Sequence, residues 1–263
     1  MSKNTEWTLG KHALITGISD GIGREITRNL ANKCRKITGV AILAEKLKAL
    51  EEELKGSKAE IKTYSIDICD KKKMGELIQQ IYEKDNDQID IFINCAGGSH
   101  VIEPFEKITC SDIEKIFDTN AKAPIFMLKE LLPRMKKNKM DKDSVKRGHI
   151  VMMSSRSAER ALPNLVVYAA AKGSIEKLVE GLQREFAQYR LVFTLVAPGS
   201  INTSFTSKWP KKPRDEHNAE SISVKEAVIP ILNALDAEYS TNRISYESTT
   251  QWLTELGVTK SSN

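Results

Sequence analysis

Short apolar runs alternate along the chain with longer segments in which apolar residues recur every three or four positions. A strand covered on both faces needs a nearly continuous apolar run, whereas a surface helix needs one apolar stripe. The short runs therefore predict buried strands at 12–16, 37–43, 60–66, 89–94, 149–154 and 191–197, with 242–246 as a candidate seventh. The longer segments predict helices near 21–32, 44–55, 70–84, 111–137, 165–189 and 223–236.

The order of these elements predicts the fold class. Strands that alternate with helices, mostly without hairpin signals, favour a mostly parallel seven-stranded sheet with helices on both faces, a doubly wound α/β fold. No linker rich in Pro, Gly or Ser divides the 263 residues, so we expect one domain over 1–263. In such a sheet the ligand site lies beyond the carboxyl ends of the strands.

Composition and charge are ordinary for a globular protein, with 40% hydrophobic and 29% charged residues. The N-terminus is polar and no apolar run reaches the membrane-spanning length of about 18 residues. We therefore expect a cytoplasmic protein with no membrane partner. Much of the net charge of +5 comes from residues 136–147, called the basic insert below, which we interpret as a solvated loop. Because this insert has no interleaved aromatic residues, we expect no nucleic-acid partner.

Neither the cysteines nor the histidines are spaced as metal ligands. The four cysteines (34, 69, 95 and 110) form no C-x-x-C pair, so we expect reduced thiols in or near the core. The four histidines lie far apart in the sequence, and we expect them on the surface or in loops. The sequence therefore predicts no metal site.

The helix expected at 165–189 begins with two titratable residues, Tyr168 and Lys172. They continue, at helical spacing, the apolar stripe that is marked by Ile175, Leu178, Val179, Leu182 and Phe186. Because an isolated buried charge is too costly, Lys172 is expected to be paired or to line a cavity. The reference pKa of tyrosine, about 10, is too high for acid–base work at neutral pH. An ammonium close to Tyr168 favours the phenolate, so we expect Lys172 to lower the pKa of Tyr168.

A glycine-rich turn, TGISDGIG at 16–23, follows the first predicted strand and opens a helix. Gly17, Gly21 and Gly23 permit tight geometry and close approach of a phosphate to the backbone. The helix that opens near Gly21 offers N–H groups and its positive dipole end to a pyrophosphate. The position of the turn after the first strand indicates a dinucleotide site rather than a plain tight turn.

Further motifs follow this turn in a fixed order along the chain. They are NCAG at 94–97, DTNAKAPIF at 118–126, Ser155 thirteen residues before Tyr168, Y-x-x-x-K at 168–172 and PGSINT at 198–203. With the G-x-x-x-G-x-G turn, they resemble the short-chain dehydrogenase/reductase family. Cys95 departs from the family motif N-N-A-G. The resemblance implies a Rossmann-type, NAD(P)-binding domain with its core over about 10–205, followed over 204–263 by a substrate flap and a C-terminal helix and strand.

The resemblance also implies a function, the transfer of a hydride between a nicotinamide cofactor and a carbonyl or secondary alcohol. Tyr168 would be the acid/base and Lys172 would also bind the nicotinamide ribose. Ser155 would stabilise the substrate oxygen, and Asn120 would hold a water of the proton relay. Taken alone, Ser155 would more often be a strand-end cap and Asn120 a locally bonded helix residue, and only the thirteen-residue spacing to Tyr168 reverses that interpretation for Ser155. The alternative function is a non-catalytic dinucleotide-binding redox sensor on the same fold.

Residues that the resemblance implies for cofactor binding lie in the glycine turn and at later strand ends. They are Gly17, Ser19, Asp20, Gly21, Ile22, Gly23, Asp67, Ile68, Asn94, Ala96, Gly97, Tyr168, Lys172, Pro198, Gly199, Ile201 and Thr203. Asp67 is expected either against the adenine or as the N-cap of the next helix, and both roles stay open. Thr203 is expected at the nicotinamide carboxamide.

The choice between NAD and NADP depends on the end of the second strand. An acid there binds the ribose 2′-hydroxyl and repels a phosphate, whereas an arginine pairs with the 2′-phosphate. This chain has Ala41 and Ile42 at those two positions, and Asp20 stands where many NADP-dependent members of the family carry a base. The absent acid removes the main barrier to NADP, and the absent cations remove its main attraction. On the family resemblance we slightly favour NADP(H) over NAD(H).

The sequence defines the substrate only as a small-molecule carbonyl or alcohol. Arg156 and Arg160 follow Ser155 and admit an anionic substrate, but both are equally explained as solvent-facing or paired residues. The polar segment 203–217 suits a flap over the pocket, with Trp209 as a candidate lid. Because family members associate through the helices expected here at 111–137 and 165–189, we expect a homodimer or homotetramer.

Overall fold

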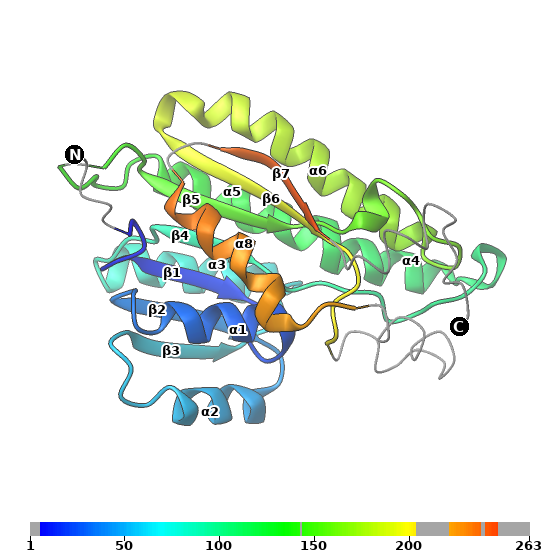
Figure 1. The fold of residues 1–263 in the computed structure, drawn as a ribbon, viewed down its shortest axis with the longest axis horizontal. Helices are drawn as coiled ribbons and strands as arrows, with labels where there is room; N and C mark the ends of the chain where they lie inside the picture. Colours follow the sequence, from blue (N-terminus) through cyan, green and yellow to red (C-terminus); the bar gives the residue numbers. More distant parts are fainter. Residues whose placement is uncertain (1–5, 143, 204–220, 238–239, 247–263) are drawn as a thin grey trace, which may run out of the picture.

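The seven strands of the described residues pair side by side in one parallel sheet, in the order β3-β2-β1-β4-β5-β6-β7 (Figure 1). The structure is a computed structural model that describes residues 6–142, 144–203, 221–237 and 240–246. The strands are β1 His12–Thr16, β2 Lys36–Ala41, β3 Glu60–Ser65, β4 Ile91–Asn94, β5 Gly148–Met153, β6 Leu191–Pro198 and β7 Thr241–Tyr246. The candidate strand at 242–246 is therefore present as β7.

Helices cover both faces of this sheet (Figure 1). They are α1 Gly21–Leu30, α2 Ala44–Glu53, α3 Lys71–Gln79, α4 Cys110–Phe117, α5 Ala123–Met135, α6 Val166–Phe186 and α8 Val224–Asp236. Successive residues of β1 contribute to opposite cores, because side chains alternate along a strand. Leu14 packs in the core with residues of α3, α5 and α6, whereas Ala13 and Ile15 pack in the core with residues of α1, α2 and α8. The doubly wound α/β fold is confirmed.

The helix expected over 111–137 is interrupted in the middle. A π-helical turn, η3 Asp118–Lys122, separates α4 from α5 and carries Asn120. The Asn120 side chain donates from Nδ2 to the carbonyl oxygen of Ile116 at 2.9 Å. Such single π turns often occur at functional sites. Apolar periodicity predicts a helix here, but it does not predict that one turn of the helix is widened by an extra residue.

The basic insert is not simply a solvated loop, because Lys146 is only 2% exposed. Its Nζ donates to the carbonyl oxygens of Leu235 at 2.6 Å and Ala237 at 2.5 Å, at the end of α8. The same Nζ lies 4.1 Å from the centroid of the Trp7 ring. The last carbonyls of a helix have no N–H donor within the helix, and the Lys146 ammonium supplies a donor to them. Lys146 therefore joins the basic insert to α8.

Two histidines and one cysteine also differ from expectation. His12 and His149 are buried within strands β1 and β5, and their Nε2 atoms bond Thr38 at 2.8 Å and Thr194 at 2.9 Å. Cys110 is exposed at the start of α4, so it is not a core thiol. Strand periodicity marks positions 12 and 149 as buried, but the polar partner that makes a buried histidine tolerable comes from a neighbouring strand.

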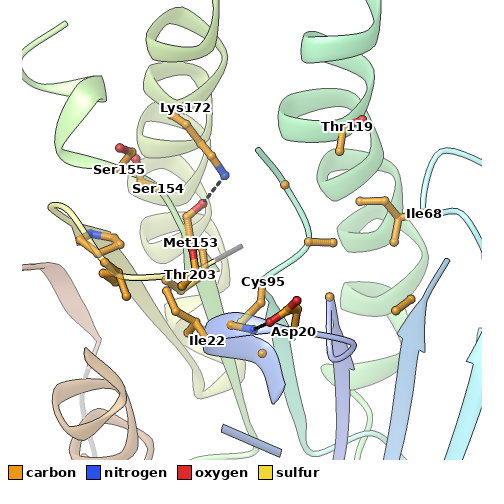
Figure 2. Close-up of a pocket in the computed structure, with 18 of the residues that line it drawn as sticks. Asp20, Ile22, Ile68, Cys95, Thr119, Met153, Ser154, Ser155, Lys172 and Thr203 are labelled. Carbon is orange, nitrogen blue, oxygen red and sulfur yellow. Dashed lines mark hydrogen bonds between the residues drawn. The ribbon is translucent and has the colours of Figure 1, made fainter. Parts of the chain in front are cut away.

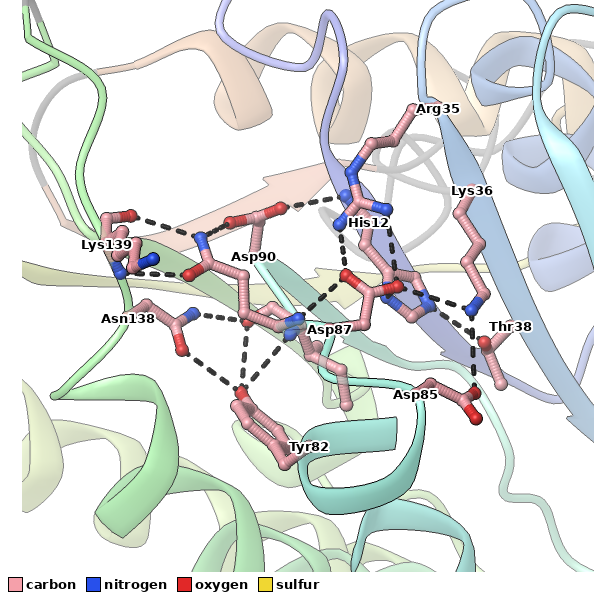
Figure 3. A network of polar contacts seen from close by, with 12 residues as sticks. His12, Arg35, Lys36, Thr38, Tyr82, Asp85, Asp87, Asp90, Asn138 and Lys139 are labelled. Atoms are coloured by element: carbon pink, nitrogen blue, oxygen red, sulfur yellow. Dashed lines mark hydrogen bonds and ion pairs between the residues drawn. The ribbon is translucent and has the colours of Figure 1, made fainter. Parts of the chain in front are cut away.

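A polar network surrounds His12 at the amino-terminal edge of the sheet (Figure 3). Asp87 forms ion pairs with Arg35 and with Lys36, and its Oδ2 lies 3.1 Å from His12 Nδ1. Asp90 accepts the backbone N–H of His12 at 2.9 Å. This network lies at the edge of the sheet opposite the strand ends where a ligand is expected.

Among the described residues, none of the helices combines the length and the apolar character that a membrane span requires.

Candidate active site

A cavity of about 520 Å³ opens at the carboxyl ends of the strands, the edge where a doubly wound sheet binds its ligand. Its walls come from the residues that follow β1, β2, β3, β4, β5 and β6 and from the first turns of α6. Figure 2 shows part of this lining. The volume falls within the usual range of ligand and cofactor sites, about 300–1,000 Å³.

The glycine turn after β1 is packed so closely that two of its positions have no room for a side chain. Gly17 has a φ of +74°, and a Cβ added there would lie 2.7 Å from the backbone nitrogen of Ala96. A Cβ on Gly23 would lie 2.4 Å from the carbonyl oxygen of Gly17. Backbone therefore forms this wall of the cavity, beside the first turn of α1. The first-turn N–H groups of a helix have no carbonyl one turn earlier, so this wall fits a pyrophosphate.

Asp20, which lines the same wall, forms an ion pair with Lys46. Asp20 caps α1 by accepting the N–H of Gly21 at 2.7 Å. Its other carboxylate oxygen lies 2.5 Å from Lys46 Nζ, which comes from the first turn of α2. Ala41, Ile42 and Leu43 line the cavity next to this pair, and Ile42 is 62% exposed. The residues at the end of β2, Ala41 and Ile42, carry no carboxylate.

Asn94 lies beneath the cavity and does not line it. The Thr16 hydroxyl donates to Asn94 Oδ1 at 3.1 Å and accepts the N–H of Ala96 at 3.2 Å. These bonds join the end of β1 to the end of β4. Asn94 thus supports the wall that Ala96 and Gly97 form.

Tyr168 and Lys172 are both buried on the stripe of α6, at 8% and 3% exposed. Lys172 Nζ donates to the carbonyl oxygen of Met153 at the end of β5, at 2.9 Å (Figure 2). The Ser155 hydroxyl is hydrogen-bonded to the phenol of Tyr168. Ser155, Tyr168 and Lys172 therefore meet at one point of the cavity wall.

The electrostatics of this group differ from the expectation that Lys172 lowers the pKa of Tyr168. Burial raises the pKa of Tyr168 to about 12, and the bond from Ser155 opposes that rise. Burial lowers the pKa of Lys172 to about 8, because desolvation penalises the ammonium. Lys172 Nζ lies 5.8 Å from the centroid of the Tyr168 ring and is directed to Met153. The prediction is therefore wrong for the protein by itself: burial raises the pKa of Tyr168, and the Lys172 ammonium is bonded to the carbonyl of Met153 rather than to the phenol.

Asn120 reaches this site from η3, behind Gly97. Its Oδ1 accepts the N–H of Gly98 at 2.8 Å, and its Nδ2 donates to the carbonyl oxygen of Gly98 at 2.8 Å. A Cβ added to Gly97 would lie 2.8 Å from Asn120 Oδ1 and 3.0 Å from Lys172 Nζ. Asn120 itself is fully buried and does not line the cavity.

The cavity brings together most of the residues that the sequence proposed for the site. Its lining includes Gly17, Ser19, Asp20, Gly21, Ile22, Gly23, Asp67, Ile68, Ala96, Gly97, Ser155, Tyr168, Lys172, Pro198, Gly199, Ile201 and Thr203. Asp67 accepts the N–H of Cys69 at 2.9 Å, whereas the N-cap of α3 is Asp70. The N-cap alternative for Asp67 is therefore wrong.

Other lining residues were not singled out by the sequence. They are mostly apolar and include Leu43, Ile66, Thr119 and Leu165. Arg156 lines the cavity, whereas Arg160 does not. The sequence marks Arg156, next to Ser155 at the end of β5, as a candidate contact, and Leu162 lies in the same segment after Ser155. Nothing in the local sequence distinguishes Ile66 from other apolar strand residues. The flap expected at 203–217, with Trp209, lies beyond Thr203 outside the described residues.

This combination of a backbone cradle for a dinucleotide and a buried proton donor beside it defines a nicotinamide-dependent oxidoreductase. A family model described as short chain dehydrogenase matches residues 11–214. The chain therefore belongs to the short-chain dehydrogenase/reductase family. It transfers a hydride between a nicotinamide cofactor and CH–OH or C=O groups of a small-molecule substrate.

One sequence relative and two solved structures illustrate what the chain is similar to, and the two structures share its fold. The chain is 29% identical, over 197 residues, to an uncharacterized oxidoreductase of Staphylococcus saprophyticus, covering 73% of this chain and 79% of that protein. A closed serine dehydrogenase complexed with NADP+ has the same fold, with a TM-score of 0.80 and 22% identity, covering 91% and 96% of the two chains. An alcohol dehydrogenase of Thermococcus sibiricus, complexed with 5-hydroxy-NADP, matches with a TM-score of 0.76 and 21% identity, covering 91% and 97%.

Proposed function

We propose that Tyr168 is the acid/base of this oxidoreductase and that Ser155 and Lys172 complete its catalytic group. The observation that carries the proposal is the meeting of these three side chains in the cavity wall opposite the glycine turn. A bound nicotinamide supplies or accepts the hydride. Tyr168 donates its proton to the carbonyl oxygen during reduction, and Ser155 stabilises the charge that develops there.

Lys172 and Asn120 are proposed to support this proton transfer from behind. The Lys172 ammonium lies 5.8 Å from the centroid of the Tyr168 ring, and it would exchange part of its contact with Met153 for the ribose hydroxyls of the cofactor. Asn120 is proposed to hold a water in the relay. Its two bonds to Gly98 support a role in fixing the backbone beside Lys172 as well.

The proposed function is tested by mixing the protein with NADPH and a panel of aldehydes, ketones, diketones and oxo-acids. Loss of nicotinamide absorbance with at least one class is the expected result. The oxo-acids should be tested beside their methyl esters, because Arg156 lines the cavity. The alternative, a redox sensor that binds the dinucleotide without catalysis, would give tight NADPH binding and no absorbance change with any member of the panel.

We also propose that NADP(H) is preferred over NAD(H). Ala41 leaves the end of β2 without the acid that would repel a 2′-phosphate, and Lys46 stands within reach of the same wall. The two neighbours described above are complexed with NADP+ and with 5-hydroxy-NADP. In this proposal the 2′-phosphate competes with Asp20 for Lys46.

Binding titrations test the cofactor preference without any substrate. We expect NADPH to bind about tenfold more tightly than NADH, the effect of one charge-assisted hydrogen bond. Ala41→Asp should reverse this order, because its carboxylate would bind the 2′-hydroxyl and repel the phosphate. Lys46→Ala should weaken the binding of NADPH and leave the affinity for NADH unchanged. Tighter binding of NADH by the unaltered protein would contradict the proposal.

We further propose a single-domain, cytoplasmic protein that assembles as a homodimer or homotetramer. Exposed apolar residues on the two candidate helices, Ile125 of α5 and Val166 of α6, support association through these helices. Light scattering during size-exclusion chromatography tests the assembly, and a monomer at micromolar concentration would contradict it.

A further inference from the structure

Three successive residues at the end of β5 are each bonded to α6, and the helix residues that they contact are spaced four apart. The bonded pairs are Met153 with Lys172, Ser154 with Glu176, and Ser155 with Tyr168. In the second pair, the Ser154 hydroxyl donates to Glu176 Oε1 at 2.7 Å. Residues spaced four apart lie on one face of a helix. Glu176 therefore continues the face that carries Tyr168 and Lys172 by one more turn.

The Glu176 carboxylate is held from its other side by the last strand. Arg243 of β7 donates from Nη1 to both oxygens of Glu176, each at 2.6 Å. Arg243 Nη2 lies 3.1 Å from Glu159 Oε2, in the loop that follows Ser155. The carboxylate of Glu176 is partly buried, and the hydroxyl of Ser154 belongs to a residue that is only 3% exposed. Partial burial strengthens these charge-assisted bonds.

We propose that Glu176 is a positioning residue for the reaction, acting through Ser154 on Ser155, with Arg243 fixing its carboxylate. The inference rests on the proposed function, because it concerns the geometry of the Ser155–Tyr168 pair. Ser155 follows Ser154 directly, so a fixed Ser154 restricts where the Ser155 hydroxyl lies relative to Tyr168. Small displacements of catalytic groups, on the order of 1 Å, can lower rates about 100-fold. Arg243 thereby gives the C-terminal strand a role in a site to which it contributes no lining residue among those described.

Kinetics of three variants test this role, using the panel carbonyl that the wild-type protein reduces fastest. Glu176→Ala and Ser154→Ala should each lower kcat by about 10- to 100-fold with KM for NADPH within about twofold, because orientation and not cofactor binding is lost. The double variant should be no slower than the slower single variant, since both changes remove the same bond. Glu180→Ala is the matched control. Glu180 lies one turn further along α6, where it pairs only with exposed Lys177 and Arg184 among the described residues, so wild-type kcat is expected.

Two further measurements separate positioning from general destabilisation. The Ser155 bond lowers the pKa of Tyr168, so Glu176→Ala should raise that pKa and move the alkaline limb of the reduction profile to higher pH. Arg243→Lys should retain a larger fraction of the wild-type kcat than Arg243→Ala, because the lysine ammonium can still donate to the carboxylate of Glu176. Thermal unfolding of each variant establishes that the assay temperature lies within its folded range.

The inference is overturned if Glu176→Ala and Ser154→Ala keep wild-type kcat and pH profile. It is also overturned if the two losses multiply in the double variant, because the residues would then act separately. Failure of the wild-type protein to reduce any carbonyl contradicts the proposed function, and with it this inference. Full activity of the wild type together with full activity of Glu176→Ala contradicts this inference alone.

Discussion

Gly23 shows at the residue scale how strictly the cavity wall is built. Its missing side chain lets the first turn of α1 contact the carbonyl of Gly17, where a Cβ would lie 2.4 Å away. We expect Gly23→Ala to lower the free energy of unfolding by about 1–3 kcal/mol through overpacking, and to weaken NADPH binding because the turn must shift.

Gly75→Ala is the matched control for this change. Gly75 lies within α3, and a Cβ there would contact nothing within 4 Å. We expect that substitution to stabilise the protein by about 0.5–1 kcal/mol and to leave NADPH binding unchanged. Denaturant unfolding and a binding titration check both. Equal effects of the two alanines on binding would show that the cradle at Gly23 is not needed.

Single residues also mark the limit of what the sequence predicted. Ser155, Tyr168 and Lys172 meet as predicted, because the carboxyl ends of parallel strands and the helix that follows lie at one edge of the sheet. The pKa of Tyr168 was predicted in the wrong direction. A pKa depends on how deeply tertiary packing buries the phenol, and a motif does not carry that information.

Lys146 is the clearest case at the scale of an element. Its ammonium binds the carbonyls of Leu235 and Ala237, at the C-terminal end of α8. Lys146→Ala would leave buried carbonyls without this donor, so we expect a loss of about 2–3 kcal/mol in the free energy of unfolding. Lys142→Ala, at an exposed position of the same basic insert, should change it by less than about 0.5 kcal/mol. Urea unfolding measures both. Equal losses in the free energy of unfolding for the two variants would show that the basic insert behaves throughout as a solvated loop.

Element types were predictable because they depend on local apolar periodicity, whereas their interruptions were not. The predicted strand 37–43 ends at Ala41, since Ile42 and Leu43 are exposed and line the cavity. The burial of Lys146 depends on carbonyls distant in sequence, and the π turn at 118–122 carries Asn120, which is bonded to the distant Gly98. The basic charge run around Lys146 favours solvent exposure, so the sequence alone misleads there.

The stability of the whole molecule should depend on pH through His12. Burial lowers the pKa of His12 from 6.5 to about 4 despite the proximity of Asp87. Between these two values the unfolded chain binds a proton that the folded protein does not, so the free energy of unfolding falls as pH falls from about 6.5 to about 4. The full effect is about 3 kcal/mol. The lowered pKa of Asp87 adds a loss at still lower pH, whereas the raised pKa of Asp90 acts in the opposite direction.

A difference measurement isolates this contribution from those of other groups. Unfolding free energies of wild type and His12→Gln should converge as pH falls through this window, because glutamine binds no proton. His100→Gln, at an imidazole that pairs with Asp112 near the surface, serves as the control. Parallel curves for wild type and His12→Gln would contradict the assignment.

The central claim is that this molecule moves a hydride while Tyr168 moves the proton. Single turnover with NADPH deuterated at C4 of the nicotinamide, followed by mass analysis of the product alcohol, tests it most directly. We predict that wild type transfers the deuterium to the former carbonyl carbon. Tyr168→Phe should bind the cofactor with unchanged affinity but transfer the label about 100- to 10,000-fold more slowly. Deuterium transfer by Tyr168→Phe at the wild-type rate, or no label in any wild-type product, would contradict the account.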